Sequence, residues 1–514
     1  MKRWLLAGVC AAAATVLLTP EQQLLGQSTL LRERSQTPGS PGVLARVGDK
    51  RLDRLVIDAG QTTLPAGNVW AVDPVTGAEY RRDELLVRFS ESAETSARAQ
   101  AARAAGGTRV PVVLARNWEV IRLAPNPNAM AAVAALRMDP HVQDVSLNHR
   151  FTSDQVSPND EYYRFQWNFD VINLPAAWQI NPGARNDVTV AVIDTGLNTT
   201  NDTFTFSTFV GQIPVRFATP PDMPTGTRIV KPFDFIYRDE FPVDLEGHGT
   251  HVAGTVAQET NNSLGAAGVA YNVNLMPLKV LGSTWEDVFF LGDSGGSSSL
   301  VAEAVRYAAD NGAKVINMSL SSPSASAPLR DAISYAVSRG VFVAVSAGNY
   351  AQEGNPTRYP AAYAREIEGV MAVGAVNRSR RRAAYSSFHP YVEICAPGGE
   401  TTGDLDYQNG ITQVSYDDTF TFAYLSPNQM FAGLQLGVRP QFDRFMMVPF
   451  EGTSMASPHV AGVAALLYSQ GIRDPRAIEQ AIKRFAAPVS ATADECGAGL
   501  IDARRALRGL GLSR

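Results

Sequence analysis

The sequence predicts an α/β protein whose main domain is a doubly wound, mostly parallel sheet, preceded by a small α+β module of the split β-α-β kind. From residue 162 onward, strand-like apolar runs alternate with helical patterns, and these runs are continuous, as in parallel strands covered on both faces. Upstream, residues 84–147 follow the order β-α-β-β-α-β. Of the 514 residues 45% are hydrophobic and 18% charged, so the chain can bury large cores.

The main domain is assigned to residues 154–514. Its clearest predicted strands are 188–193, 274–280, 315–319, 341–346 and 371–376. Predicted helices are 300–311, 329–339, 455–470 and 475–485. Two long, turn-rich stretches interrupt the alternation and are predicted as insertions outside the core, 201–242 and 399–451. In open parallel sheets the active site lies at the carboxyl ends of the strands, so side chains that follow these strands are candidates.

The small module is assigned to residues 76–153. We expect strands at 85–89, 110–114, 118–123 and 142–147, with helices at 93–105 and 129–137. The first helix is stopped by Gly106 and Gly107. No catalytic cluster is evident here, and the polar stretch 148–158 is a natural domain boundary.

The N-terminus has the pattern of an export signal, which we assign to residues 1–27. Lys2 and Arg3 precede an apolar stretch at 4–18 that is too short for a comfortable membrane span. We therefore expect a secreted protein, extracellular or periplasmic, and an uncleaved N-terminal anchor is the alternative. Residues 28–75 are rich in Gly, Pro, Gln and Arg and are assigned to a linker.

The charge balance and the absence of sequence repeats argue against several classes of partner. The net charge is -5 and no basic stripe is evident, which argues against nucleic-acid binding. No later segment is long and apolar enough to predict a membrane span. Neither a coiled-coil repeat nor a repeat array is present, and we expect a monomer.

Three cysteines bear on the redox state of the chain. Cys10 lies inside the signal, which leaves Cys395 and Cys496 as an even pair in an exported chain. Disulfides persist in oxidising compartments, so a bridge is one hypothesis and two free buried thiols are the other.

Four polar residues occupy positions suited to acyl transfer. Asp194 ends an apolar strand, and His248 lies between two glycines. Ser454 lies at the start of an apolar helix, and Asn349 follows another strand. Each has an ordinary explanation by itself: a structural carboxylate, a core histidine, a helix cap or a strand end.

Together these residues form a complete set for nucleophilic catalysis. Ser454 would be the nucleophile, His248 the base that removes its proton, and Asp194 the carboxylate that orients the imidazole. Asn349 and the Ser454 backbone N–H would hold the oxyanion. The order Asp, His, Ser along the chain is one of three known for this geometry. His251, three residues after His248, is interpreted as a core histidine rather than a metal ligand.

Three sequence blocks identify a family. Residues 192–196, 247–254 and 452–459 resemble the signature blocks of subtilisin-like serine proteases, the subtilases, and the resemblance extends over about residues 155–510. The preceding module resembles the inhibitory propeptide of the family. The resemblance implies a secreted endopeptidase, made as a zymogen that cleaves itself between Asn148 and Pro158. Its partners would be protein or peptide substrates and its own propeptide as inhibitor.

The same resemblance implies a calcium site and a substrate cleft. Ca²⁺ would be a structural cofactor bound beside the loop 261–266, through Asp160, Asp202 and Asn262. Thr260 adds one residue to this loop relative to the family pattern. The strands that flank the substrate would contain Gly295, Gly296, Ser297, Leu320 and Ser321, with Gly348 beside Asn349.

Two alternative functions remain open at this point. The insertions would restrict the cleft in an exopeptidase or in a processing protease of narrow specificity. A catalytically silent, secreted binding protein on the same scaffold is the alternative from another class. No member of the predicted Asp–His–Ser set is missing, which argues against the silent protein. Tyr350, which follows Asn349, argues against selection for basic substrate side chains.

Overall fold

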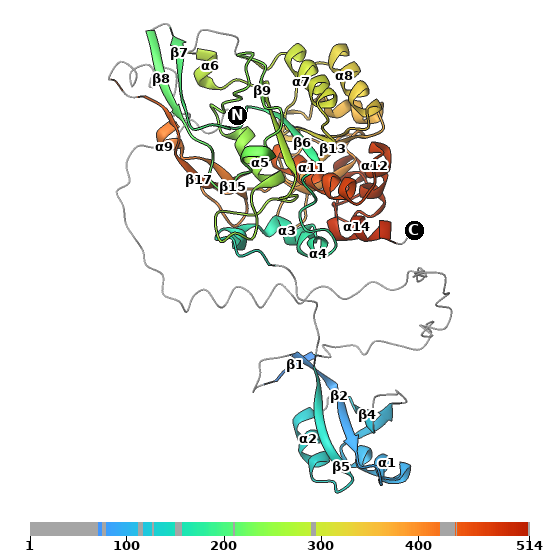
Figure 1. The fold of residues 1–514 in the computed structure, drawn as a ribbon. Helices are drawn as coiled ribbons and strands as arrows, with labels where there is room; N and C mark the ends of the chain where they lie inside the picture. The colour runs from blue at the N-terminus through green and yellow to red at the C-terminus, as the bar shows by residue number, and fades with distance from the viewer. Residues whose placement is uncertain are drawn as a thin grey trace. The chain divides into compact units, whose positions relative to one another are not determined.

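The computed structural model describes residues 70–73, 79–110, 117–125, 128–149, 157–208, 211–288, 295–421, 437 and 439–511. These residues form two compact units, an N-terminal unit that ends before residue 155 and a C-terminal unit that follows it (Figure 1). The predicted signal, the linker up to residue 69 and most of the expected self-cleavage stretch lie outside the described residues.

The N-terminal unit is an antiparallel sheet with two helices. Its elements are β1 (Trp70–Val72), β2 (Glu79–Phe89), α1 (Thr95–Ala104), β3 (Gly107–Val110), β4 (Trp118–Leu123), α2 (Ala129–Arg137) and β5 (Val142–His149). The strand order is β1-β2-β4-β3, and β5 pairs with β2. Leu85, Val87 and Phe89 alternate along β2 and are fully buried in one core with residues of both helices. The predicted β-α-β-β-α-β order is confirmed, and β1 is an additional strand. The strand expected at 110–114 corresponds to β3, which begins three residues earlier, and residues 111–114 lie outside the described residues.

The C-terminal unit is built on a seven-stranded parallel sheet of order β14-β13-β12-β11-β6-β10-β9. Its strands are β6 (Thr189–Asp194), β9 (Phe233–Asp234), β10 (Asn274–Lys279), β11 (Val315–Met318), β12 (Phe342–Ser346), β13 (Val370–Val376) and β14 (Ile394–Pro397). Five of the seven were predicted from continuous apolar runs, and all five lie at the predicted positions within about one residue. The doubly wound parallel fold is therefore confirmed.

Helices cover both faces of this sheet (Figure 1). Along β6, Val190 and Val192 belong to the core that includes α5 (His248–Ala257) and α11 (Thr453–Ser469). Ala191 and Ile193 point to the opposite core, which α7 (Ser298–Asp310) and α8 (Ala327–Ser338) cover. Since successive side chains of a strand point to opposite faces, a strand buried on both sides must be apolar throughout.

Shorter helices complete the unit. They are α3 (Trp167–Val171), α4 (Leu174–Trp178), α12 (Pro475–Arg484), α13 (Ala493–Cys496) and α14 (Ala503–Gly511), with single 3₁₀ turns at Tyr163–Phe165, Gly226–Arg228, Ala351–Glu353 and Ala361–Arg365. Within the described residues, no helix combines the length and the apolar character that crossing a membrane requires.

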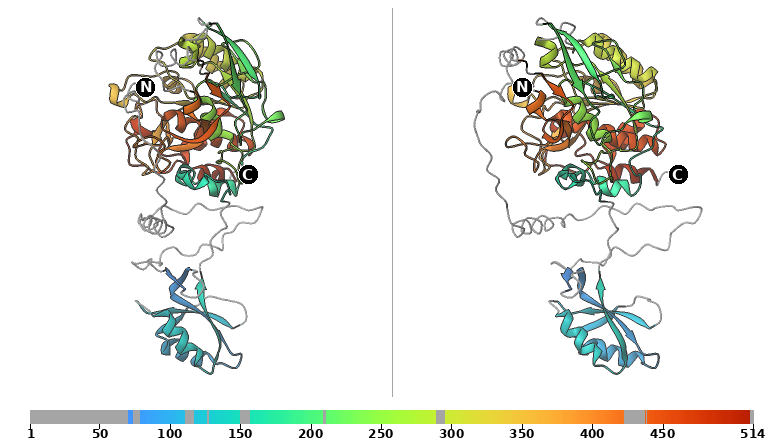
Figure 2. Two further views of the ribbon diagram at one scale, coloured as in Figure 1. Left: turned by 90° about the vertical axis from the view of Figure 1, so that its left-hand side faces the viewer. Right: turned by 60° about the vertical axis from the view of Figure 1, so that its left-hand side comes forward.

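The two predicted insertions pack against each other. The first contributes β7 (Thr203–Thr208) and β8 (Gly211–Phe217), and the second contributes β15 (Ile411–Tyr416), α9 (Asp418–Thr421), β16 (Gln441–Phe442) and β17 (Phe445–Phe450). β16 pairs with β8, and β15 pairs with β17. A separate aromatic cluster joins them with α6 (Thr284–Val288) through Phe206, Phe217, Trp285, Tyr416 and Phe442. Figures 1 and 2 show the β7–β8 hairpin at the periphery of the C-terminal unit.

The prediction that both stretches lie outside the core was wrong in two places. β9, inside the first stretch, forms the edge of the main sheet beside β10. Ile411 and Val414 of β15, inside the second stretch, are fully buried in the main core. β9 has only two residues, and three of the six residues of β15 are polar, so neither strand shows a continuous apolar run in the sequence.

Cys395 of β14 and Cys496 of α13 form a disulfide, which decides between the two cysteine hypotheses. The bridge closes a loop of 101 residues and ties the C-terminal segment to the edge strand of the main sheet.

Candidate active site

Asp194 and His248 form a close pair at the carboxyl edge of the main sheet. Asp194 is the last residue of β6 and is fully buried, whereas His248 is the first residue of α5 and keeps 24% of its side chain exposed. Asp194 Oδ1 lies 2.6 Å from His248 Nδ1 and also accepts the Thr195 N–H at 2.8 Å. Gly247 caps α5 with a φ of 98°, a left-handed conformation that favours glycine. The imidazole is thus held by Nδ1, and Nε2 is available for chemistry.

The charge on Asp194 governs the protonation of His248. Burial by itself would lower the pKa of His248, but the Asp194 carboxylate opposes this through its charge and its hydrogen bond. The balance raises the pKa of His248 to about 9. A base with this pKa becomes neutral, and able to accept a proton, as the pH rises into the alkaline range.

A second buried carboxylate, Asp244, ties the Asp194 segment to the His248 segment. Its Oδ1 accepts the Thr195 hydroxyl at 3.0 Å and the Gly247 N–H at 2.8 Å. Its Oδ2 accepts the Thr250 N–H at 2.9 Å and the Thr250 hydroxyl at 2.6 Å. Asp244 is fully buried. Sequence reasoning missed this residue, whose only sequence signal is an acidic side chain four residues before His248.

A buried lysine lies beside Asp194. Lys279 on β10 is the register partner of Asp194, and its Nζ donates to the Thr195 carbonyl at 2.9 Å. Glu286 of α6 lies 3.1 Å from the same nitrogen and balances its charge. Burial would lower the pKa of Lys279, and the facing carboxylates outweigh that effect and raise it. Lys279 therefore stays charged and paired.

Ser454 is the second residue of α11, where the helix has not yet formed its full set of hydrogen bonds. Pro458 lacks the N–H that would bond to the Ser454 carbonyl, and that carbonyl accepts the Ser319 hydroxyl at 2.8 Å instead. The Ser454 hydroxyl donates to the Ser319 carbonyl at 3.3 Å. Asn317 donates to Ser319 Oγ and accepts the Ser457 hydroxyl, so a neutral network anchors this turn to β11.

Asn349 lies against the same turn. Its Oδ1 accepts both the Thr453 N–H at 2.9 Å and the Thr453 hydroxyl at 2.8 Å. Its Nδ2 would come within 3.3 Å of a methyl group added to Gly452, the residue before Thr453. Because the amide oxygen is occupied, the amide nitrogen faces the start of α11 as a hydrogen-bond donor.

The predicted substrate-flanking residues lie on two segments. Gly295 and Gly296 have left-handed φ values, and Gly296 donates to the Val280 carbonyl at 2.6 Å. Ser297 caps α7, because its Oγ accepts the Leu300 N–H. Leu320 and Ser321 continue from β11, past Ser319. Gly348 donates its N–H to the Thr453 hydroxyl at 3.1 Å and so contacts the turn that contains Ser454.

The predicted metal ligands are only partly brought together. Asp160 accepts the N–H groups of Asn261 and Asn262 at 2.8 and 3.0 Å, as the loop interpretation requires. Asp202 lies elsewhere, at the start of β7, where it accepts the Thr203 N–H. Asp222 takes its place beside the loop, since its Oδ1 accepts the Asn262 side-chain amide at 2.6 Å.

Asp222 was missed because it lies between prolines in a stretch without periodicity. Burial and the nearby Asp160 raise the pKa of Asp222 to about 6, against the effect of its hydrogen bonds with Asn262, Gln258 and Ala266. Two carboxylates and an amide oxygen at one loop are donors that fit Ca²⁺. No cluster of three His, Cys, Asp or Glu side chains is found within the described ranges.

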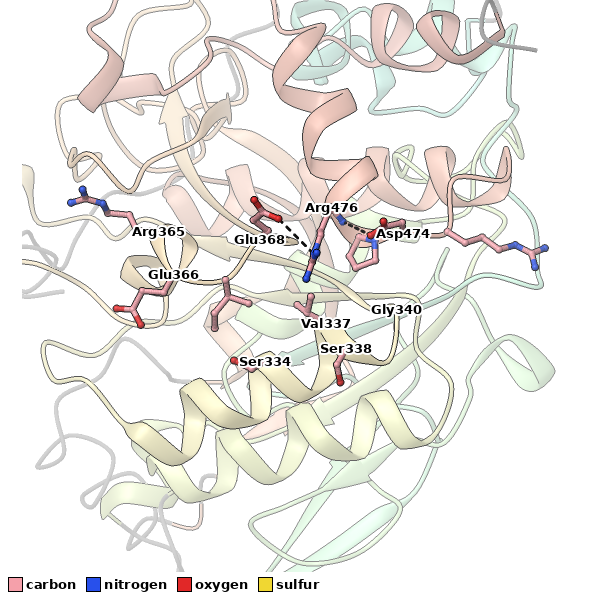
Figure 3. A pocket seen from close by; sticks show the side chains of 12 residues that line it. Ser334, Val337, Ser338, Gly340, Arg365, Glu366, Glu368, Asp474 and Arg476 are labelled. Atoms are coloured by element: carbon pink, nitrogen blue, oxygen red, sulfur yellow. Dashed lines mark hydrogen bonds and ion pairs between the residues drawn. The ribbon is translucent and has the colours of Figure 1, made fainter.

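A hollow of about 780 Å³ at the opposite edge of the sheet is a separate feature (Figure 3). It lies between α8 and the start of α12, and Gly340 and Glu368, which line it, come just before β12 and β13. Arg476 and Glu368 pair across it at 3.6 Å. The hollow is therefore at the amino ends of the strands, whereas Asp194 and Asn349 follow carboxyl ends.

A carboxylate–imidazole pair and a serine at a helix start, on one edge of a parallel sheet, are the features of an α/β serine peptidase. The sequence matches the subtilase family, Peptidase S8, over residues 185–499, and the fervidolysin N-terminal prodomain over residues 67–148. The chain belongs to the subtilase family of serine proteases and has an N-terminal prodomain.

Individual relatives agree with this assignment. The chain is 34% identical to a thermophilic serine proteinase of Bacillus sp. strain AK1, over 80% of this chain and 84% of the relative. It is 31% identical to thermitase of Thermoactinomyces vulgaris, over 68% and 99% of the two chains. The solved structure of a protease from Pseudoalteromonas arctica is 29% identical, with a TM-score of 0.53, and covers 69% of this chain and 99% of its own.

Proposed function

We propose that the chain is a secreted serine endopeptidase that hydrolyses peptide bonds through Asp194, His248 and Ser454. The observation that supports this most directly is the 2.6 Å contact between buried Asp194 and His248. Family membership supports the reaction class, and the position of Ser454 at the start of α11 supports its role as nucleophile.

The reaction begins when Ser454 Oγ attacks the substrate carbonyl carbon and its proton passes to His248 Nε2. Asp194 keeps the imidazole in the tautomer with hydrogen on Nδ1 and stabilises the imidazolium that forms. The tetrahedral intermediate collapses to an acyl-enzyme, and the leaving amine takes the proton from His248. Water then hydrolyses the ester by the reverse sequence, with His248 again as base.

The oxyanion of the tetrahedral intermediate is held by the Asn349 side-chain amide and the Ser454 N–H. Thr453 occupies the Asn349 oxygen, so the amide nitrogen needs no reorientation during the reaction. A donor fixed in this way contributes about 3 kcal/mol to lowering the barrier, a magnitude measured on another member of this family.

Labelling with a fluorophosphonate tests this proposal on the purified protein. We expect one covalent adduct on Ser454 and none in Ser454→Ala. Ser334→Ala, an exposed serine on α8, is the matched control and should label as the wild type does. No adduct in the processed wild-type protein would contradict the proposal. If the enzyme shortens the peptides of a library from one end only, it is an exopeptidase and not an endopeptidase.

We also propose that the chain is exported and is a zymogen that processes itself after the N-terminal unit, between Asn148 and Pro158. The prodomain supports this, because it matches a family of prodomains that precede proteases. Ser454→Ala should then accumulate with its N-terminal unit attached, as an intact mass would reveal. Normal processing of this variant in a host without other secreted proteases would contradict self-cleavage.

Calcium is proposed as a structural cofactor, with Asp160, Asp222 and Asn262 as its side-chain ligands. When bound it neutralises two buried carboxylates and fixes the loop 261–266. A chelator should lower the melting temperature of the wild type. The shift corresponds to about 2.7 kcal/mol if free Ca²⁺ was present at a hundred times the dissociation constant of the site. Asp222→Asn should lose this chelator effect and Asp202→Asn, the matched control, should retain it. The reverse result would restore Asp202 as the ligand.

A further inference from the structure

We propose that Arg358 makes the protease selective for substrates with a side-chain carboxylate, glutamate or aspartate, at the residue that supplies the scissile carbonyl. This inference rests on the proposed function, because it concerns the specificity pocket of the same site. It assigns a role to a buried arginine that neither the Asp–His–Ser set nor the oxyanion donors explain.

Arg358 lies beside the segment that leads away from the nucleophile. Tyr359, its neighbour, pairs with Ser322 through two backbone hydrogen bonds of 2.7 and 2.9 Å. Ser319 on that segment contacts Ser454, and Ser321 lies two residues beyond it, about 7 Å along an extended chain. Arg358 Nε donates to Ser321 Oγ at 3.3 Å. The guanidinium therefore contacts, two residues further along, the same segment that contacts the nucleophile.

The other side of Arg358 contacts the oxyanion segment. A methyl group added to Gly348 would lie 3.0 Å from Arg358 Cγ, so the aliphatic stem runs directly past the residue before Asn349. The guanidinium carbon lies 3.8 Å from the centroid of the Tyr350 ring. Arg358 is therefore enclosed by the two segments, Leu320–Ser321 and Gly348–Tyr350, that were expected to border the substrate.

The charge of Arg358 has no carboxylate partner in the part of the chain that the structure describes. Arg358 is buried, with 7% of the residue exposed, and none of the ion pairs within the described residues involves it. Lys279, by contrast, is a fully buried cation that lies 3.1 Å from the Glu286 carboxylate. Burying a cation without a counter-ion is unfavourable, and a substrate carboxylate would supply the missing charge.

The Arg358 guanidinium also has N–H donors that form no hydrogen bond within the described residues. A guanidinium has five N–H donors, and within the described residues Nε bonds to Ser321 Oγ while Nη2 reaches the Ser321 carbonyl only at 3.5 Å. The Tyr350 ring lies against the guanidinium carbon, and a ring face does not use up the N–H donors, so the remaining N–H groups are available for a bidentate pair. The planar fork of arginine matches carboxylate geometry, and a basic substrate residue would meet a like charge.

The experiment compares fluorogenic peptides that are identical except at this residue, which is Glu, Gln, Leu or Lys. We expect kcat/KM for Glu to exceed that for Gln by about ten-fold to a hundred-fold near neutral pH, because a charged hydrogen bond replaces a neutral one. Lys should be the poorest of the four. If the wild-type enzyme cleaves the Gln or the Leu peptide with the same kcat/KM as the Glu peptide, the inference is overturned without any variant.

Variants then test whether Arg358 is responsible. Arg358→Gln should reduce the Glu-to-Gln ratio to about one, and Arg358→Lys should retain part of it. Arg185→Gln removes an exposed arginine that pairs with Asp187 and should leave the ratio unchanged. A Glu preference that survives in Arg358→Gln would assign selectivity to another residue and overturn the proposal.

Fluorophosphonate labelling separates the two proposals. A wild-type protein that labels on Ser454 but shows no preference for Glu contradicts only the selectivity. A protein that neither labels nor cleaves any of the four peptides contradicts the proposed function and, with it, the selectivity. If Arg358→Gln does not fold, as loss of labelling would reveal, the wild-type ratio and Arg358→Lys decide the question.

Discussion

The two halves of the candidate site are held in place by different chemistry. Asp194 and His248 are joined by Asp244, a buried carboxylate whose oxygens accept hydrogen bonds from both segments. Ser454 is anchored by neutral groups, through Ser319 and Asn317 of the β11 segment. Hydrogen bonds to a charged group contribute about 1.5–3 kcal/mol each, against about 0.5–1.5 kcal/mol for neutral ones. The half that contains Asp194 and His248 should therefore be the more sensitive to substitution.

The largest effect is expected for Asp194→Asn. An amide cannot hold the His248 tautomer or stabilise its cation, and kcat should fall by about 10⁴-fold, the magnitude typical of serine-protease triads. In the wild type, kcat/KM should rise with pH until His248 is neutral, because its pKa is raised to about 9. Without the Asp194 charge this inflection should move to lower pH. Rate profiles from pH 5 to 11 measure both effects, and an unmoved inflection would show that Asp194 does not set the pKa.

Asp244→Asn is expected to have the next largest effect. The new amide nitrogen takes the place of one of the two oxygens and would face the N–H group of either Gly247 or Thr250, so at least one buried donor would lose its acceptor. We expect a loss of about 1–3 kcal/mol in the free energy of unfolding.

Because Asp244 acts through His248, kcat should fall more than KM rises. Asp187→Asn, at an exposed pair with Arg185, is the control and should change neither quantity. Denaturant unfolding and steady-state kinetics report the two effects. If stability falls while kcat is unchanged, Asp244 is structural only.

Ser457→Ala tests the neutral network that anchors Ser454. It removes the hydroxyl that donates to Asn317 at 2.7 Å and leaves one neutral buried acceptor unpaired. We expect a loss of about 1 kcal/mol in unfolding free energy and a rate within a few-fold of the wild type. If Ser457→Ala is as damaging as Asp244→Asn, the contrast between charged and neutral anchoring is wrong.

Short-range patterns in the sequence were sufficient for most of the fold. Continuous apolar runs predicted five strands of the main sheet because burial on both faces requires every residue to be apolar. The β4 and α2 boundaries of the N-terminal unit were predicted to the residue, since each is bounded by turn residues. The helix that begins at His248 was not predicted, because Gly249 and Gly254 weaken its local preference and tertiary packing supplies its stability.

The parallel α/β class, the family and the residues proposed for the chemistry could all be predicted from the sequence, because they depend on local patterns and short signature blocks. The residues that lie beside them became known from the folded structure alone. Asp222 rather than Asp202 reaches the loop at Asn262, and Asp244 joins two segments 49 residues apart. Arg358 approaches Ser321 across 37 residues. Such contacts join residues that are far apart in the sequence, and no local periodicity or motif spacing predicts them.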